Sequence, residues 1–231
     1  MMIKTPTVYL FDIDGTLITS GGSGRRAIIH SFEKALDRGG VALSFSFAGM
    51  TDRMIVRQGL AELGLPISED AIDTILSDYL TTLEQEIRES DRYGLHPGVR
   101  AALDSLVNQE NVALGLGTGN VEAGARIKLE PVNLNYYFDF GGFGCDAEAR
   151  EALILRGAER GAEKLGLARE DCRVVVIGDT PRDIHAARAI GAQCIAVSTG
   201  GATAEELAAN DPDWLFSDLT ADGALEALWG I

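Results

Sequence analysis

Four short runs of apolar residues, at 8–11, 112–117, 173–177 and 194–197, constrain the fold of this chain more than any other feature. These runs lack the regular alternation of polar and apolar side chains that a half-exposed strand shows. Residues with helical patterns lie between them. This order is typical of an α/β protein, in which crossover helices wrap a parallel sheet. Two further apolar stretches, at 137–140 and 214–216, predict shorter outer strands.

The segment between the first and second runs is too long for one crossover. It contains three helical patterns, at 23–36, 51–63 and 68–87, and Thr51 is a candidate N-cap for the second. We interpret this segment as an inserted all-helical cap. The predicted division is a core at 1–19 and 96–231 and a cap at 20–95.

Glycine and proline mark both ends of the predicted cap. Gly21, Gly22 and Gly24 stand at the first connection, and Pro97 and Gly98 stand at the second. A hinge between core and cap would use such residues, but glycine clusters also form plain flexible turns. Both interpretations remain open at the level of sequence.

Charge and cysteine content exclude several classes of function. Lys and Arg total 20 against 35 Asp and Glu, a net charge of −15 that disfavours nucleic acid and anionic lipid as partners. A small anionic substrate is not excluded, because a bound cation can reverse the potential inside one cleft. The three cysteines lack metal-ligand spacing and are expected to be reduced. No apolar run has the length of a membrane span, so we expect a cytoplasmic protein.

Two carboxylates follow the first apolar run directly. Asp12 and Asp14 stand one residue apart at the point where the predicted strand ends in Gly15. Strand residues two positions apart point the same way, into the crevice where open α/β sheets bind ligands. Two negative charges held so close together require a cation.

Polar residues also follow two other predicted strands. Thr118 lies in a Gly-Thr-Gly-Asn run, and Asp179 follows Gly178. Each could be an ordinary helix N-cap, and for Thr118 alone that interpretation is favoured. Right-handed crossovers nevertheless bring these strand ends to one edge of the sheet. Three carboxylates that meet there require Mg²⁺ or lose much solvation energy.

The order Asp12-x-Asp14-Gly15-Thr16, then Thr118, then Gly178-Asp179-Thr180-x-x-Asp183 resembles the haloacid dehalogenase superfamily of phosphotransferases. The resemblance covers nearly the whole chain. It implies a Rossmann-like parallel sheet core. The helical insertion is similar to the cap of the branch that contains phosphoglycolate phosphatase and β-phosphoglucomutase.

The resemblance implies roles for the acidic residues. Asp12 would be the nucleophile and would form an aspartyl-phosphate that water then hydrolyses. Asp14 would be the general acid and base, a role for which we expect a raised pKa. Mg²⁺ would be held by Asp12, Asp179 and the main-chain oxygen of Asp14. Asp183 would contact the metal, orient its waters or orient a basic neighbour, or it would cap the following helix.

Phosphate binding is implied for the segment after the second predicted strand. Thr118 would donate a hydrogen bond to a phosphate oxygen, and the amides of Gly119 and Asn120 would assist at the start of the next helix. In the predicted cap, Arg53 could contact the substrate or could be a surface residue. The three histidines, His30, His96 and His185, lack metal spacing.

The chain departs from the family at the residue that supplies a cation. Related proteins usually carry Lys-Pro before the helix that precedes the last motif, and no Lys-Pro occurs here. Arg150 stands about where that lysine is expected, and Lys128 is a second candidate. Either would neutralise phosphate and nucleophile, and either could instead be a solvated helix charge. The sequence favours Lys128 slightly.

Together these features predict a Mg²⁺-dependent phosphatase that acts on a small phosphorylated metabolite such as a sugar phosphate or phosphoglycolate. A phosphomutase of the β-phosphoglucomutase type needs the same residues. A non-catalytic phosphate-binding protein is a third alternative, which the missing Lys-Pro keeps open.

Overall fold

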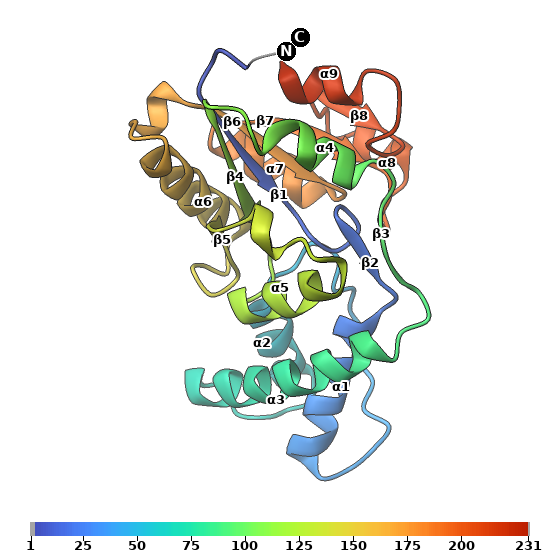
Figure 1. The fold of residues 1–231 in the computed structure, drawn as a ribbon. Helices are drawn as coiled ribbons and strands as arrows, with labels where there is room; N and C mark the ends of the chain where they lie inside the picture. Colours follow the sequence, from blue (N-terminus) through green and yellow to red (C-terminus); the bar gives the residue numbers. More distant parts are fainter. Residues whose placement is uncertain (1–2, 231) are drawn as a thin grey trace.

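The computed structural model of the chain describes residues 3–230 (Figure 1). Residues 1, 2 and 231, which fall in the predicted core, lie outside the described range. The main sheet is parallel, with the strand order β5-β4-β1-β6-β7-β8, so the predicted α/β class is confirmed. Its strands are β1 Thr7–Phe11, β4 Val112–Gly117, β5 Gly141–Gly142, β6 Arg173–Gly178, β7 Gln193–Val197 and β8 Trp214–Phe216.

The register of the central strands determines which residues meet at the edge of the sheet. Phe11, the last residue of β1, pairs with Leu116 of β4 on one side and with Ile177 of β6 on the other. The residues that follow these three strands therefore leave the sheet at nearly the same level. Asp12, Thr118 and Asp179 are among them.

Both faces of the sheet are covered by helices. Tyr9 and Phe11 of β1 pack on one face against α4 (Val99–Leu106), α5 (Glu122–Leu129) and α9 (Ala224–Trp229). Val8 and Leu10 pack on the opposite face, because neighbouring strand residues alternate in direction. The helices on that face are α6 (Arg150–Lys164), α7 (Pro181–Ala189) and α8 (Ala204–Ala208). In Figure 1, α4 and α6 lie on opposite sides of β4.

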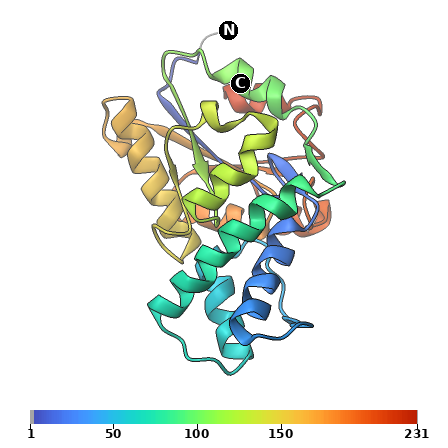
Figure 2. The same ribbon diagram turned by 60° about the horizontal axis from the view of Figure 1, so that its bottom comes forward.

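Three helices form a separate group below the sheet in Figures 1 and 2. They are α1 (Ser23–Leu36), α2 (Asp52–Glu62) and α3 (Glu69–Arg88), close to the predicted ranges. Thr51 caps α2 as predicted, since its side chain accepts a hydrogen bond from the Met54 amide. These helices share a hydrophobic cluster, which includes Phe32, Tyr79 and Leu83 and which Val121 of the core joins. The domain boundaries at 20 and 95 stay a prediction, which this cluster, formed mainly by cap residues, supports.

A small antiparallel ribbon, which the sequence patterns do not predict, joins the two connections of the cap. Its strands are β2 (Ile18–Ser20) and β3 (Tyr93–Leu95), and Ile18 pairs with Leu95. Each strand has only three residues, too few for a periodic pattern to predict it. The two connections are therefore held side by side and enter the cap together.

The predicted strand at 137–140 is wrong. Residues Asn135–Tyr137 form a 3₁₀ helix, and the edge strand β5 follows it at Gly141–Gly142. The apolar side chains of Tyr137 and Phe138 are buried beside β1 instead of forming a strand face. Glycine is required in β5, because a Cβ on Gly142 would overlap the main chain of Leu153 in α6. Glycine is unfavourable in strands, so pattern alone could not place β5 there.

Two further 3₁₀ turns, Glu130–Val132 and Arg169–Asp171, complete the described elements. Within residues 3–230, none of the helices is both long enough and apolar enough to cross a membrane.

Candidate active site

The turn after β1 carries the two carboxylates at the centre of the site. Asp12 is buried, and the amide of Asp12 donates to the Ile177 carbonyl of β6 across 2.9 Å, which continues the sheet register. Gly15 has a φ of 85°, a left-handed conformation that favours glycine. A Cβ at Gly15 would also overlap the carboxylate of Asp179. The glycine therefore allows the β1 turn and the β6 turn to approach closely.

Asp12, Asp179 and Asp183 form a buried acidic cluster. Each offers a carboxylate oxygen, and these oxygens all lie within 4.8 Å of one another. Burial, followed by the charges of Asp12 and Asp183, raises the pKa of Asp179 to about 8. Burial also raises the pKa of Asp12 to about 6, although Arg150 opposes this shift. The cluster lacks enough positive charge for its carboxylates, and its hard oxygen donors are those that Mg²⁺ prefers, so these residues fit the ion.

Arg150, the first residue of α6, lies within this cluster. Its side chain is only 7% exposed, and Nη2 lies 2.9 Å from an Asp12 oxygen and 2.5 Å from an Asp183 oxygen. The two carboxylates raise the pKa of Arg150 despite its burial. Asp183 also accepts hydrogen bonds from the amide and hydroxyl of Thr180, 3.1 and 2.7 Å away. Asp183 thus both caps α7 and orients a basic neighbour.

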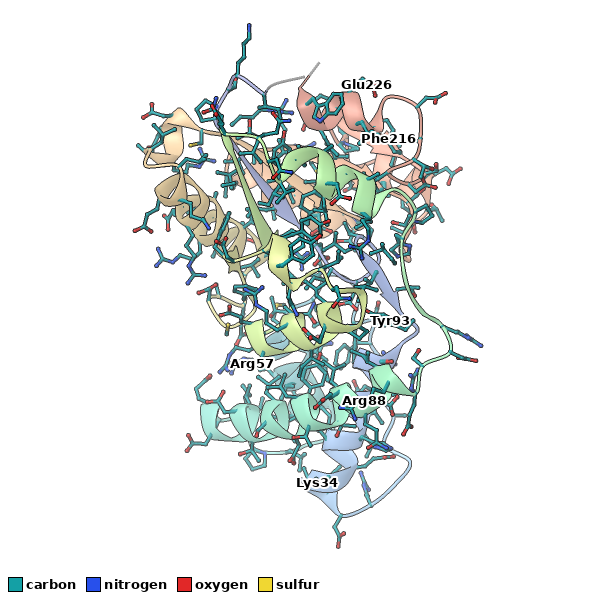
Figure 3. All side chains as sticks on the ribbon, in the orientation of Figure 1. Lys34, Arg57, Arg88, Tyr93, Phe216 and Glu226 are labelled. Carbon is teal, nitrogen blue, oxygen red and sulfur yellow. The ribbon has the colours of Figure 1, made fainter. Side chains whose placement is uncertain are left out.

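Lys128, near the end of α5, contacts the second carboxylate of the β1 turn. Its Nζ donates to Asp14 Oδ2 and to Asn120 Oδ1, both across 2.6 Å. Tyr93, labelled in Figure 3, holds the end of α5 by donating to the Lys128 carbonyl across 2.6 Å. The sequence left Lys128 and Arg150 as alternatives, but the structure brings both into the site. Each cation contacts a different carboxylate of the β1 turn.

The expected raised pKa of Asp14 is wrong for this structure. Desolvation in the cleft would raise it, but the charge of Lys128 and hydrogen bonds from Lys128, Asn120 and Ser20 outweigh that effect. The pKa of Asp14 is therefore lowered. The side chain of Asp14 remains 39% exposed, so it can still reach a molecule in the cleft.

Thr118 and Asn120 extend the site from the end of β4. Thr118 is fully buried, and its hydroxyl accepts hydrogen bonds from the Asn120 main-chain amide and side-chain amide. Asn120 Nδ2 also donates to Asp14 Oδ2 across 3.0 Å. The helix begins at Glu122, so the amides of Gly119 and Asn120, expected at its start, lie in the loop before it. The Asn120 side chain therefore contacts Asp14 directly, in addition to the amide role expected for this residue.

These groups open onto a cavity of about 430 Å³ between the core and the three cap helices. Asp12, Asp14 and Asp179 line it from the core, and Gly119 lines it beside Met50. The other lining residues used below are Gly24, Arg25, Asp52, Tyr79, Thr118, Asn120, Lys128 and Arg150. His96 also lines the cavity, whereas His30 and His185 are exposed.

The expectation that Arg53 reaches the substrate is not met by its position. Among the described residues, Arg53 is absent from the cavity lining, and its guanidinium pairs with Glu69 and Asp73 of α3. Arg25 lines the cavity in its place and donates to the main chain of the loop before α2. Arg25 stands directly after the glycines of the first connection. That position could have suggested its place at the cavity, because the chain passes from the core into the cap there.

Two cap residues that contact the core were also missed. The amide of Asp52 donates to the Gly119 carbonyl across 2.8 Å, and its carboxylate accepts from the Val121 amide across 2.9 Å. Arg57, labelled in Figure 3, donates to both oxygens of Glu148, two residues before Arg150. No sequence signal distinguishes these residues from ordinary helix charges. The cap and the core are thus joined at the loop after β4 and at the segment just before α6.

A comparison with protein-family models matches residues 9–197 to haloacid dehalogenase-like hydrolases. The chain belongs to this family. Among curated relatives, the probable phosphatase IndB of Dickeya dadantii is 27% identical, with 96% of this chain and 94% of that protein covered. The phosphoglycolate phosphatase of Yersinia pestis is 29% identical, with coverage of 90% and 89%.

Solved structures of the family share the same fold. A predicted phosphatase from Clostridium acetobutylicum superposes with a TM-score of 0.71 at 20% identity, covering 99% of this chain and all of that one. A putative β-phosphoglucomutase from Thermotoga maritima gives 0.62 at 20% identity, with 97% and 99% covered. At such identities the likeness shows the fold alone, which confirms the Rossmann-like core expected from the sequence.

Proposed function

We propose that this chain is a Mg²⁺-dependent phosphomonoester hydrolase that acts on a small phosphorylated metabolite through an aspartyl-phosphate on Asp12. One observation carries the proposal: Asp12 and Asp14 line the same cavity, and each contacts its own buried cation. The names of the curated relatives, which include phosphatases of several bacteria, support the same reaction class.

In the first step, a carboxylate oxygen of Asp12 attacks phosphorus and the ester bond to the leaving oxygen breaks. Arg150, 2.9 Å from Asp12, orients this carboxylate and offers a guanidinium to the phosphate charge. Because the pKa of Asp14 is lowered in the free protein, the proton for the leaving oxygen enters with the phosphate monoanion of the substrate. Asp14 relays this proton to the leaving oxygen, so the alcohol departs neutral. Thr118 is placed to donate to a phosphate oxygen, because its hydroxyl oxygen accepts from Asn120 while its hydrogen stays available.

In the second step, water attacks the phosphorus of the aspartyl-phosphate and Asp14 takes up the proton of that water. Inorganic phosphate leaves and the Asp12 carboxylate is restored. Lys128 and Asn120 hold Asp14 in one orientation through both steps, because each donates to its Oδ2 atom.

Asp12, Asp179 and the main-chain oxygen of Asp14 would hold Mg²⁺, with Asp183 in the same cluster. The bound ion would supply positive charge to the transferred phosphoryl oxygens. The raised pKa of Asp179 is consistent with a carboxylate whose cation is supplied from outside the chain.

The test is phosphate release from a chromogenic phosphomonoester and a panel of phosphorylated metabolites, with Mg²⁺ and with EDTA. We expect turnover with Mg²⁺, its loss with EDTA, and its abolition in Asp12→Asn. Asp171→Asn, a change at an exposed carboxylate, is the matched control. Wild-type rates in Asp12→Asn would refute the nucleophile, and absence of metal-dependent turnover on every ester would refute the hydrolase. Phosphate transfer within a sugar without release would indicate the phosphomutase instead.

A further inference from the structure

One buried polar group of the cavity is left without a role by the reaction described above. Tyr79 of α3 is 0% exposed and lines the cavity, and its hydroxyl lacks a hydrogen-bond partner within the described part of the chain. Buried hydroxyls are nearly always hydrogen-bonded, because an unpaired one loses its contacts with water and gains nothing. An orphaned hydroxyl at a ligand cavity therefore indicates a group that the ligand satisfies.

The Tyr79 hydroxyl and the Lys128 ammonium face the same gap beside α1. The missing side chain of Gly24 creates this gap: a Cβ there would lie 3.3 Å from Lys128 Nζ and 3.9 Å from the Tyr79 hydroxyl. Gly24 itself lines the cavity. A ligand atom that enters the cavity beside Gly24 therefore lies near both polar groups.

Lys128 has a hydrogen-bond donor left for such a ligand. An ammonium group donates three hydrogen bonds, and two of them go to Asp14 and Asn120. Because Nζ lies 2.6 Å from the carboxylate proposed to protonate the leaving oxygen, the gap adjoins the leaving group and not the phosphate.

The charges around the gap favour a neutral ligand group. Asp14 and Asp52 both act on the Tyr79 hydroxyl, and with burial they raise the pKa of Tyr79, which keeps it an O–H donor. A ligand carboxylate would add a third negative charge beside the Lys128 ammonium, since the Arg25 guanidinium, which also lines the cavity, is engaged by the main chain of the loop before α2. A ligand hydroxyl would add no charge, and it could accept from Lys128 or Tyr79 and donate to a carboxylate.

We propose that Tyr79, Lys128 and the gap at Gly24 form an alcohol subsite, which selects phosphomonoesters whose leaving group carries a further hydroxyl over those that carry a carboxylate. This inference deepens the proposed function and rests on it. Tyr79 is the specificity-determining residue, because its hydroxyl has no partner within the described residues until such a ligand binds.

Three two-carbon esters test the subsite, because they differ only at the second carbon: ethyl phosphate, 2-hydroxyethyl phosphate and phosphoglycolate. For the wild type, kcat/KM should be highest for 2-hydroxyethyl phosphate. Tyr79→Phe should lower the ratio of kcat/KM for 2-hydroxyethyl phosphate to that for ethyl phosphate about tenfold, the effect of one lost hydrogen bond. The matched control is Tyr136→Phe, a change at a tyrosine that is 67% exposed, which should keep the wild-type ratio.

Gly24→Ala supplies an independent variant, because its methyl group fills the gap while Tyr79 keeps its hydroxyl. It should lower the same ratio. Thermal unfolding checks the fold of both variants. Tyr79→Phe removes no hydrogen bond of the described structure, so its melting temperature should not fall. Three results would overturn the subsite. The first is a ratio of kcat/KM for 2-hydroxyethyl phosphate to that for ethyl phosphate that Tyr79→Phe leaves unchanged. The others are a wild-type value of this ratio near one and a wild-type preference for phosphoglycolate.

Calorimetric binding separates this inference from the hydrolase itself. 3-Hydroxypropylphosphonate and propylphosphonate replace the ester oxygen by a methylene, so they bind without turnover. With Mg²⁺ present, the wild type should bind the hydroxylated compound about tenfold more tightly, and Tyr79→Phe should abolish that preference. If the wild type shows this binding preference but hydrolyses none of the esters, the subsite is supported and the hydrolase is refuted. Hydrolysis without the preference would refute the subsite alone.

Discussion

Arg150 is expected to stabilise the fold as well as the site, and Arg150→Met tests this. The guanidinium is 7% exposed, and its partners Asp12 and Asp183 are 8% and 0% exposed at their side chains. Coulomb attraction across the 2.9 Å to Asp12 amounts to about 6 kcal/mol at an effective dielectric constant of about 20, before desolvation is subtracted. Methionine has a similar length but no charge, so two buried carboxylates would lose their cation. Breaking a buried pair in this way costs about 3–5 kcal/mol.

Urea unfolding at pH 7 without added metal measures this cost. The matched control is Arg156→Met on the same helix, where a 54% exposed arginine pairs with Glu159 and its loss should cost no more than about 0.5 kcal/mol. Phosphatase turnover of Arg150→Met should also fall by about 10²-fold, as for the loss of one donor to a developing charge. The stabilising role of Arg150 would be refuted if the free energy of unfolding of Arg150→Met lay within about 1 kcal/mol of the wild-type value. It would also be refuted if Arg150→Met and Arg156→Met lost equal amounts.

Three further predictions concern the metal, a buried carboxylate and a backbone turn. Saturating Mg²⁺, at about 100 times its dissociation constant, should raise the melting temperature by about 5–10 °C, and Asp179→Asn should remove most of that rise in calorimetry. Burial raises the pKa of Asp52 from 3.8 to about 6, so the stability that this group contributes below pH 4 is lost as the pH rises through 6. Asp52→Asn should therefore gain about 3 kcal/mol relative to the wild type between pH 4 and pH 7 in urea unfolding, and a constant difference would contradict this. Gly98→Ala should cost at least about 3 kcal/mol, because Gly98 has a φ of 79° and a Cβ there would overlap the main chain of Leu219. Gly64→Ala, with a φ of 67° and open space around it, should cost only about 1 kcal/mol, and equal costs would refute the overlap.

The local patterns of the sequence predicted most of the fold. The buried strands β1, β4, β6 and β7 lie within one residue of the apolar runs, because a strand covered on both faces is apolar along its length. The N-cap at Thr51 was likewise readable from neighbouring residues. Right-handed crossovers between parallel strands bring their carboxyl ends to one edge of the sheet, so the placing of Asp12, Thr118 and Asp179 there required no knowledge of side-chain packing.

What the sequence could not predict depends on contacts between distant residues. The β2–β3 ribbon joins residues more than 70 positions apart, and β5 is a pair of glycines selected by its contact with α6. The roles of the basic residues depend on helix packing in the same way. Arg53 turns to carboxylates of α3, whereas Lys128 reaches Asp14, 114 positions away in the chain.

The sequence by itself therefore determined the sheet, the helices of the cap and the carboxylates at the strand ends, because each of these depends on the periodicity of neighbouring residues. Only the tertiary structure decided which cation contacts which carboxylate, and that Tyr79 lies buried at the cavity with a hydroxyl that no residue of the range 3–230 pairs with. The physical reason is that a helix side chain finds its partner through the packing of whole elements, and a one-residue change in a helix start rotates that side chain by about 100°.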